Sequence, residues 1–190
     1  MNSATTEYQK GYPLPRTGFA YDCLVRGLDA SFWKTIAATA SAASNKIRLA
    51  SGGNICSYTQ FKYGRFIFAL NVPTTPSAGE AKKWGLLMPA AATIGSAYFE
   101  ISGATFKCVT YSDAAVVQST TVTWSAYEAT ETLFEIEWES DLVIFKINGT
   151  AVATHQTSTG QTPLPLYLIN SDADNTDLGY VTIKETAIYV

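Results

Sequence analysis

Short runs in which hydrophobic and polar residues alternate recur along most of the 190-residue chain. Turn-forming residues separate these runs at intervals of about 8 to 12 residues. This spacing is typical of an all-β fold, because each run supplies a strand with one buried face. Segment 35–46, TIAATASAASNK, is the one helix candidate, but it lacks an apolar stripe, so a loop or single turn fits it equally well.

The clearest predicted hairpin lies in LFEIEWESDLVIFKINGTAVATH. Phe134, Ile136 and Trp138 alternate with three glutamates, so one face should enter the core and the carboxylates should cover the solvent face. The second strand ends at Asn148-Gly149, a dipeptide that favours tight hairpin turns because both residues readily adopt positive φ. A turn also explains the Asn-Gly-Thr sequence better than glycosylation does.

The stretch FKYGRFIFALNVP, at 61–73, predicts a further strand. Phe66, Phe68 and Leu70 share one parity, Gly64 interrupts the run, and a proline ends it. One face of this strand should therefore be buried.

Residues 1–18 predict an N-terminal arm outside the sandwich. Glycines and prolines punctuate this segment, and no apolar period runs through it. We expect the arm to dock on the domain itself or on another subunit. The expected assembly contacts are Tyr8, Tyr12, Pro13 and Pro15. Residues 19–190 then form the main domain.

Charge and composition narrow the function classes. Hydrophobic residues make up 47% of the chain and charged residues 15%, against the roughly 25% charged that is usual. Such a surface suits a protein that packs against neighbours, although a plain β domain with a polar uncharged surface fits as well. The net charge of −3 and the lack of a basic run argue against nucleic-acid binding.

Membrane and export signals are also missing from the pattern. No run of about 18 apolar residues occurs, so we expect no transmembrane helix and no membrane partner. The beginning of the chain, MNSATTEYQKGYPLPR, lacks the apolar core of a signal peptide. A location outside the cell would then require lysis, another export route or a particle.

The cysteines and the single histidine carry no recognisable chemistry. Cys23, Cys56 and Cys108 are widely spaced without a CxxC motif, which argues against a zinc ribbon or a redox site. We expect Cys56 and Cys108 to act as small hydrophobes. His155 has no nucleophile motif nearby, so we expect an exposed polar strand residue there.

Several motifs in order resemble the concanavalin A-like jelly rolls, especially the laminarinase-type β-glucanases. FKYGRFIFALNVP resembles the strand that opens their cleft sheet, and FEIEWESDLVIFKINGTAVATH resembles their Trp- and Gly-containing hairpin. PLPLYLIN and LGYVTIKETAIYV resemble their closing strands. The resemblance covers roughly residues 30 to 190 and implies a two-sheet antiparallel jelly-roll β-sandwich, with function implied only by analogy.

The catalytic motif of those glucanases is incomplete in this chain. Their catalytic strand carries E-x-D-x-x-E, and a retaining mechanism needs two carboxyl groups about 5–5.5 Å apart. The resemblance places SAYFEISGATFK there, with Glu100, Ser102 and Thr105 at the three carboxylate positions. Ile67 and Ala69 likewise stand where it implies polar cleft residues. A lone Glu100 could serve as nucleophile or acid but not both, so we expect no hydrolysis.

Glu100 and several aromatic residues remain candidates for binding. Glu100 is expected to be an exposed strand residue between core-facing Phe99 and Ile101. Aromatic side chains bury much area at low entropic cost, so they favour sugar or partner contacts. Trp33 and Trp124 are weaker aromatic candidates, while Trp138 should be core. Trp84 is the preferred surface tryptophan, because its run borders the cleft in the resembling family. The predicted binding residues are Trp84, Glu100, Ser102, Tyr111 and Tyr127.

An acidic loop, NSDADNTDLG, is a weak calcium candidate. Asp172, Asp174 and Asp177 supply the kind of oxygen ligands that Ca²⁺ prefers. The EF-hand spacing fails because its twelfth position would be Ile183, and aspartates are also ordinary turn residues. No other cofactor is expected.

Two non-enzymatic functions compete on this basis. The favoured one is a structural or decoration subunit of a larger assembly, most naturally a viral particle such as a phage, with other protein subunits as partners. The second is a lectin-like carbohydrate-binding module that keeps the cleft without the catalysis. A glycan hydrolase or lyase is the third alternative.

Overall fold

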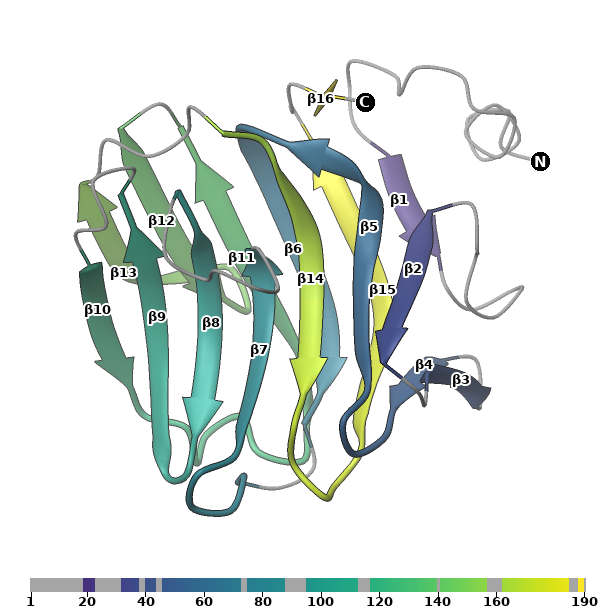
Figure 1. Cartoon of the computed structure of the whole chain (residues 1–190). Coiled ribbons are helices and arrows are strands. Elements are labelled where there is room, and N and C mark those ends of the chain that lie inside the picture. Colours follow the sequence, from purple (N-terminus) through teal and green to yellow (C-terminus); the bar gives the residue numbers. More distant parts are fainter. Residues whose placement is uncertain are drawn as a thin grey trace.

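The chain folds into two β-sheets that pack face to face, as the computed structural model shows (Figure 1). The structure describes residues 19–22, 32–37, 40–43, 46–72, 75–87, 95–112, 117–139, 141–156, 162–184 and 188–189. These ranges form sixteen strands and no helix, so none of them holds a helix that could cross a membrane. The predicted arm, 1–18, and Cys23 lie outside the described residues.

Sheet A has eight strands, and all of its pairings are antiparallel. Its order is β13 (Thr150–Gln156), β12 (Leu142–Ile147), β11 (Glu131–Trp138), β6 (Gly64–Asn71), β15 (Thr176–Lys184), β4 (Lys46–Leu49) and β3 (Ala40–Ala43). The eighth strand, β1 (Phe19–Asp22), pairs with β15.

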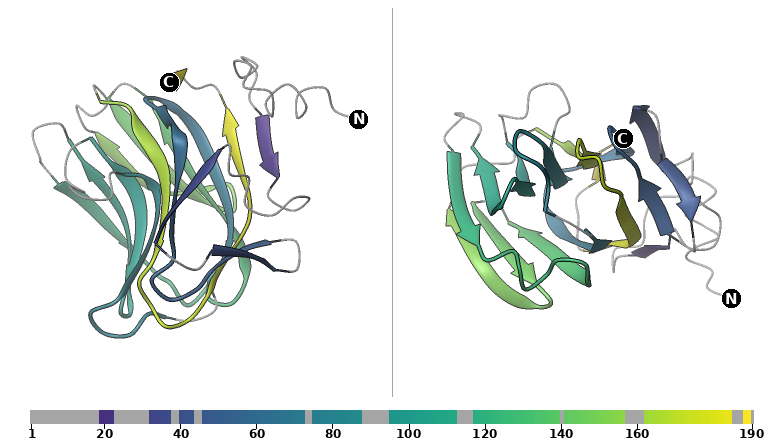
Figure 2. Two further views of the ribbon diagram at one scale, coloured as in Figure 1. Left: turned by 45° about the vertical axis from the view of Figure 1, so that its right-hand side comes forward. Right: turned by 90° about the horizontal axis from the view of Figure 1, so that it is seen from below.

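Sheet B also has eight antiparallel strands and forms the second layer (Figures 1 and 2). Its order is β10 (Val117–Val122), β9 (Thr105–Tyr111), β8 (Ala97–Ser102), β7 (Ala81–Leu86), β14 (Leu164–Asn170), β5 (Asn54–Phe61) and β16 (Ile188–Tyr189). The eighth strand, β2 (Trp33–Ala37), pairs with β5. The chain passes repeatedly from one sheet to the other, which is the connectivity of a jelly roll. The predicted all-β, two-sheet antiparallel sandwich is confirmed.

Aromatic rings from both sheets fill the core between them. Trp84 of sheet B lies 5.8 Å from the ring of Phe99 and 4.8 Å from that of Phe134 in sheet A. Phe145, also in sheet A, contacts Phe99 at 5.1 Å between ring centroids. Offset and edge-to-face pairs of this kind add to the stabilisation from buried area. Cys108 lies in the same core as a free thiol, so its predicted role as a small hydrophobe is confirmed.

The predicted hairpin at Asn148-Gly149 forms as expected. Asn148 has φ 50° and Gly149 has φ 79°, so both turn residues adopt the left-handed region between β12 and β13. Phe134, Ile136 and Trp138 face the core. The expectation of a solvent face opposite them is wrong for Glu135, whose side chain is only 5% exposed because Arg65 and Lys146 cover it.

The described parts of segment 35–46 are strands rather than a helix or a loop. It contributes the end of β2, which pairs with β5, and all of β3, which pairs with β4. Small Ala, Ser and Thr residues supply no hydrophobic signal in either direction, so backbone hydrogen bonds to neighbouring strands decide the structure.

The stretch 61–73 is two strands rather than one. Phe61 ends β5 in sheet B, the chain turns at Lys62-Tyr63, and β6 begins at Gly64 in sheet A. The strand of Glu100 belongs to sheet B, so the implied position of β6 in the same cleft sheet is wrong. Ile67 and Ala69 therefore lie in a different sheet from Glu100, so they give no evidence about whether the surface around Glu100 is polar.

His155 connects the two sheets instead of facing solvent as expected. It lies on β13 of sheet A, and its ring nitrogens pair with Thr110 Oγ1 and Thr120 Oγ1 of sheet B, each at 2.9 Å. Burial lowers the pKa of the imidazole, so the neutral ring is favoured. The single histidine thus joins the edge strands β13 and β10, with Phe145 packed against it at 5.4 Å.

Candidate functional site

The outer face of sheet B carries most of the predicted binding residues. Phe99 and Ile101 are fully buried in the core, as expected, so the alternation of β8 turns Tyr98, Glu100 and Ser102 to the opposite face. These three side chains are the starting points of the candidate site.

A tight hairpin brings two further side chains onto this face. Gly103-Ala104 reverses the chain between β8 and β9, which places Thr105 opposite Ser102 and Lys107 opposite Glu100. Together these four residues line a pocket of about 340 Å³. Thr105 therefore lies on the neighbouring strand, which corrects the alignment that placed it on the same strand as Glu100.

Glu100 forms an ion pair with Lys83, its cross-strand neighbour on β7. The Lys83 Nζ to Glu100 Oε1 distance is 2.9 Å, with side-chain exposures of 25% and 22%. Glu100 is therefore half-buried and its charge is balanced by Lys83, whereas it was expected to be freely exposed. Lys107, on its other side, has no ion-pair partner among the described residues.

Tyrosines continue the face toward the opposite end of the strands. Lys83 Nζ lies 5.5 Å from the ring centroid of Tyr98, and the Tyr98 and Tyr111 rings stack at 6.4 Å. Tyr98 is buried, and burial together with the nearby charge of Glu100 raises the pKa of its hydroxyl. Tyr111 remains half-buried beside it.

Gly85 sets the spacing of this row of strands. It pairs with Tyr98 of β8 on one side and Tyr167 of β14 on the other, with φ 149°. A Cβ at this position would lie 2.5 Å from the carbonyl oxygen of Ala97 and 2.8 Å from Tyr98 Cβ. Only glycine lets β7 and β8 approach this closely.

Trp84, the preferred surface tryptophan, is a core residue with 1% exposure. It shares the inward parity of β7 with Lys82 and Leu86, whereas Lys83 takes the outward position. The sequence KKW does not reveal this register, because a lysine is normally expected to face solvent and Lys82 faces the core. Lys82 is tolerated there because its Nζ lies 3.1 Å from the buried carboxylate of Asp172.

The remaining aromatic candidates do not join the Glu100 pocket. Tyr127 lies in the loop between β10 and β11, half-buried against the core. Trp33 is buried, and Trp124 lines a different pocket. Trp138 is core, as predicted.

The aspartates of the acidic loop take part in ion pairs and hydrogen bonds. Asp172 pairs with Lys82, Asp177 pairs with Arg48 at 2.8 Å, and the backbone carbonyl of Asp174 accepts hydrogen bonds from Lys82 and Asn170. Asp172 and Asp174 thus share Lys82, whereas Asp177 pairs with Arg48. No group of three His, Cys, Asp or Glu side chains that could hold a metal ion occurs among the described residues. The calcium site therefore stays a prediction.

Lys83 and Lys107 are the site residues that the sequence interpretation missed. The signal was present, because a two-residue turn at Gly103-Ala104 fixes Lys107 opposite Glu100. Recognising Lys83 required the register of β7, which depends on β14 and on the pairing of Lys82 with Asp172, both far along the chain.

Among the residues that the structure describes, the strands of this face contribute a single carboxylate. Glu100 is the one acidic residue in the described strands of sheet B. Glu80, just before β7, accepts a hydrogen bond from Ser102 Oγ through its backbone carbonyl, but its carboxyl group hydrogen-bonds to Asp172. The Asp172 hydrogen bond, with burial and repulsion, raises the pKa of Glu80. Double displacement at a sugar would need a second carboxyl group beside Glu100.

The fold is that of the concanavalin A-like jelly rolls. Several solved structures of glycan-active proteins superpose on the chain. A Bacillus licheniformis β-glucanase is 13% identical with a TM-score of 0.69, covering 88% of this chain and 98% of that one. Crh5 transglycosylase is 14% identical with a TM-score of 0.68, covering 90% and 87% of the two chains. A non-specific endo-β-1,3(4)-glucanase from family GH16 is 10% identical with a TM-score of 0.68, covering 90% and 92%.

These likenesses show the fold that the motifs predicted, and they show nothing finer at such low identity. No protein-family model matches the sequence, and no curated protein matches it either.

Proposed function

We propose that the chain is a glycan-binding protein that does not cleave its ligand, and that the outer face of sheet B is its binding surface. The observation that carries this proposal is the state of Glu100, a single carboxylate neutralised by Lys83 at 2.9 Å. A fold used by glycan-active proteins supports the glycan as ligand, and the lone carboxylate supports binding without hydrolysis.

The pocket beside Glu100 offers matched groups for sugar hydroxyls. Glu100 accepts hydrogen bonds, Lys107 donates them, and the hydroxyls of Ser102 and Thr105 do both. Half-buried Tyr111 adds an aromatic surface on the same face. Ligand sites commonly combine a few convergent polar groups with such surfaces.

A polysaccharide panel tests the proposal directly. We expect the protein to be retained by at least one polysaccharide, and Lys107→Ala to weaken binding roughly tenfold, the loss expected for one charged hydrogen bond. Lys62→Ala, in the turn between β5 and β6, is the matched control and should bind normally. Failure to bind any glycan, or equal losses for both variants, would refute the assignment.

Hydrolysis is tested separately. We expect no release of reducing ends from β-glucans by the unmodified chain, and no difference on Glu100→Gln. Activity that falls with Glu100→Gln would favour the hydrolase alternative.

A role as a structural subunit of a larger assembly stays a prediction. The exposed large hydrophobic residues among the described ones are Tyr58, Val117 and Leu133, which lie on β5, β10 and β11. These strands are far apart in the two sheets, so the three side chains do not form one patch. Sizing the protein with and without residues 1–18 tests this role: loss of an oligomer on truncation would support it, and a monomer in both cases would contradict it.

A further inference from the structure

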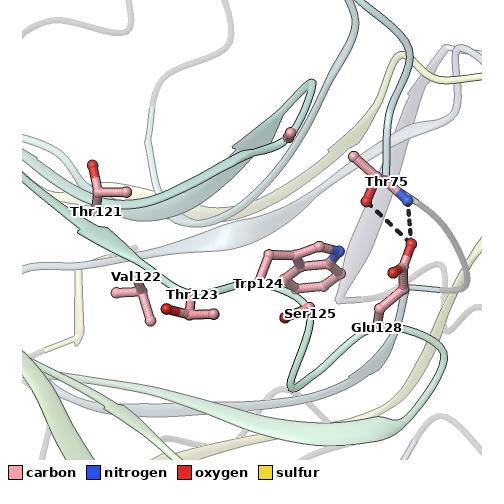
Figure 3. A pocket seen from close by; sticks show the side chains of 8 residues that line it. Thr75, Thr121, Val122, Thr123, Trp124, Ser125 and Glu128 are labelled. Carbon is pink, nitrogen blue, oxygen red and sulfur yellow. Dashed lines mark hydrogen bonds between the residues drawn. The ribbon is translucent and has the colours of Figure 1, made fainter.

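A second pocket lies at the end of the sandwich, between the end of β10 and the loop that follows it (Figure 3). Its volume of about 430 Å³ falls in the range of roughly 300–1,000 Å³ that is usual for ligand sites. Its polar lining comes from Thr75, Thr121, Thr123, Trp124, Ser125 and Glu128. None of these residues belongs to the Glu100 pocket.

Hydrogen bonds fix the loop that forms the wall of this pocket. Tyr127 N donates to Trp124 O at 2.8 Å, and Ala129 N donates to Val72 O at 3.0 Å. Glu128 Oε1 accepts from both Thr75 N at 2.9 Å and Thr75 Oγ1 at 3.1 Å. The wall is therefore held in place before any ligand binds, which lowers the entropic cost of binding.

Trp124 brings an unused donor to this wall. Its side chain is buried and packs on Phe106 at 5.2 Å between ring centroids. Its Nε1 has no hydrogen-bond acceptor among the described residues. Figure 3 shows the indole nitrogen on the side of the ring that faces Thr75 and Glu128. The indole nitrogens of Trp84 and Trp138 also lack acceptors. All three tryptophans belong to the core cluster, but of the three Trp124 alone also lines a pocket.

The lining selects a class of ligand. Trp124 offers a hydrogen-bond donor, and Glu128 offers its second carboxylate oxygen, Oε2, as an acceptor. A hydroxyl group can accept from the first and donate to the second. An ammonium group could satisfy only Glu128, and an anion could satisfy only Trp124 while Glu128 repels it. Ala104 and Val122 add apolar surface for carbon–hydrogen groups.

We propose that this pocket binds a neutral ligand with adjacent hydroxyl groups, such as one sugar ring, between Trp124 and Glu128. This pocket shares no lining residue with the Glu100 pocket, although Thr121 of β10 pairs with Lys107 of β9. The proposal does not depend on whether the Glu100 pocket binds a glycan.

Titration of the full chain with neutral monosaccharides (glucose, galactose and mannose) tests the inference. We expect at least one sugar to give saturable calorimetric heat, with a matching change in tryptophan fluorescence. Glu128→Gln replaces the acceptor Oε2 by a donor and should weaken binding about tenfold. Trp124→Phe keeps the ring on Phe106 but removes the N–H, and it should weaken binding several-fold by calorimetry. Glu139→Gln, an exposed glutamate after β11, is the matched control and should change nothing.

Each outcome decides the question. No saturable signal with any of the sugars, or unchanged affinity in Glu128→Gln, overturns the site. Methylammonium and acetate serve as probes of the competing classes, and Glu128-dependent binding of methylammonium as tight as that of the sugars overturns the hydroxyl assignment. Lys107→Ala should leave monosaccharide binding at this pocket intact, so failure of the Glu100 face and failure of this site are separate results.

Discussion

The outer faces of the two sheets handle charge in opposite ways. On sheet A, each of the four cations with described side chains has an acidic partner: Lys46 with Glu131, Arg48 with Asp177, and Arg65 and Lys146 with Glu135 and Glu137. On sheet B, Lys83 is paired with Glu100, while Lys107 beside the pocket has no ion-pair partner among the described residues.

The charged side chains on the outer face of sheet A are thus paired with one another, whereas sheet B keeps at least one cation without an ion-pair partner among the described residues. On sheet A, Arg65 holds Glu135 through two hydrogen bonds of 2.7 and 2.8 Å, so little remains for a partner to contact. On sheet B, Lys83, Glu100 and Lys107 lie side by side on neighbouring strands, and only the first two form an ion pair. Glu100 and Lys107 also line the pocket. Ion pairs therefore stabilise one face, whereas polar groups on the other are available for binding.

The largest effect should come from a pair buried more deeply than either face. Lys82 and Asp172 have side-chain exposures of 0% and 3%. Burial acts to raise the pKa of Asp172, but the hydrogen bonds of Glu80 and Lys82 and the charge of Lys82 lower it overall. Asp172→Asn leaves a buried ammonium without its counter-charge, so we expect unfolding free energy to fall by about 3 kcal/mol. Urea denaturation followed by tryptophan fluorescence measures this, and a loss below that of Glu135→Gln would contradict the order proposed here.

Glu135→Gln should be the most damaging single change on the sheet A face. It removes the counter-charge of Arg65 and Lys146 at a nearly buried position. Because Arg65 itself is 37% exposed, water offsets part of the loss, and we expect about 2 kcal/mol. Glu137→Gln, at a more exposed position on the same strand, is the control and should cost less.

Acid should weaken the same face. Burial acts to raise the pKa of Glu135, but the hydrogen bonds and charges of its neighbours, above all Arg65, lower it overall. A carboxyl group with a lowered folded-state pKa stabilises the fold fully above its unfolded pKa of about 4.3, and that contribution disappears as pH falls through the folded pKa. The unfolding free energies of the unmodified chain and of Glu135→Gln should therefore converge on acidification. A difference between them that does not change with pH would contradict this prediction.

His155→Gln tests the contact between the two sheets. It should cost about 1–2 kcal/mol, because at most one of the two threonine hydrogen bonds can be replaced. Burial lowers the pKa of His155, so its contribution is complete above about pH 6.5 and declines as pH falls toward the folded pKa. Hydrogen exchange at β10 and β13 should accelerate in the variant. Unchanged protection there would show that the contact does not hold the edges together.

Glu100→Gln should have the smallest effect on stability, below about 1 kcal/mol, because its ion pair is partly solvated. The same chemical change thus gives a sharp contrast between Glu135 and Glu100. Equal losses at the two positions would remove the distinction between the faces.

The parts of the fold that follow local rules were predictable. Alternation placed Phe134, Ile136 and Trp138 in the core, and Asn148-Gly149 positioned the hairpin. These signals are short-range, since a strand's own parity and a turn's own φ angles determine the outcome.

The errors arose where a distant partner decides. Lys82 faces inward because Asp172 meets it, and that register takes Trp84 into the core. Glu135 is covered by Arg65 and Lys146, and His155 by threonines of the other sheet. Sequence periodicity contains no information about such partners. The burial of these polar residues therefore could not be predicted, and they were expected to face solvent. The Glu100 strand was found by motif, but its neutralising Lys83 depended on the strand order.

Because Gly85 has no side chain, β7 can pack closely against β8, and position 85 should tolerate substitution less well than the pocket residues nearby. Alanine there would meet the backbone of β8, so the neighbouring strand would have to move away and carry Glu100 with it. The ion pair between Lys83 and Glu100 would then be weakened. Substitutions should therefore be tolerated at the pocket residues Ser102, Thr105 and Lys107, while Gly85 stays fixed.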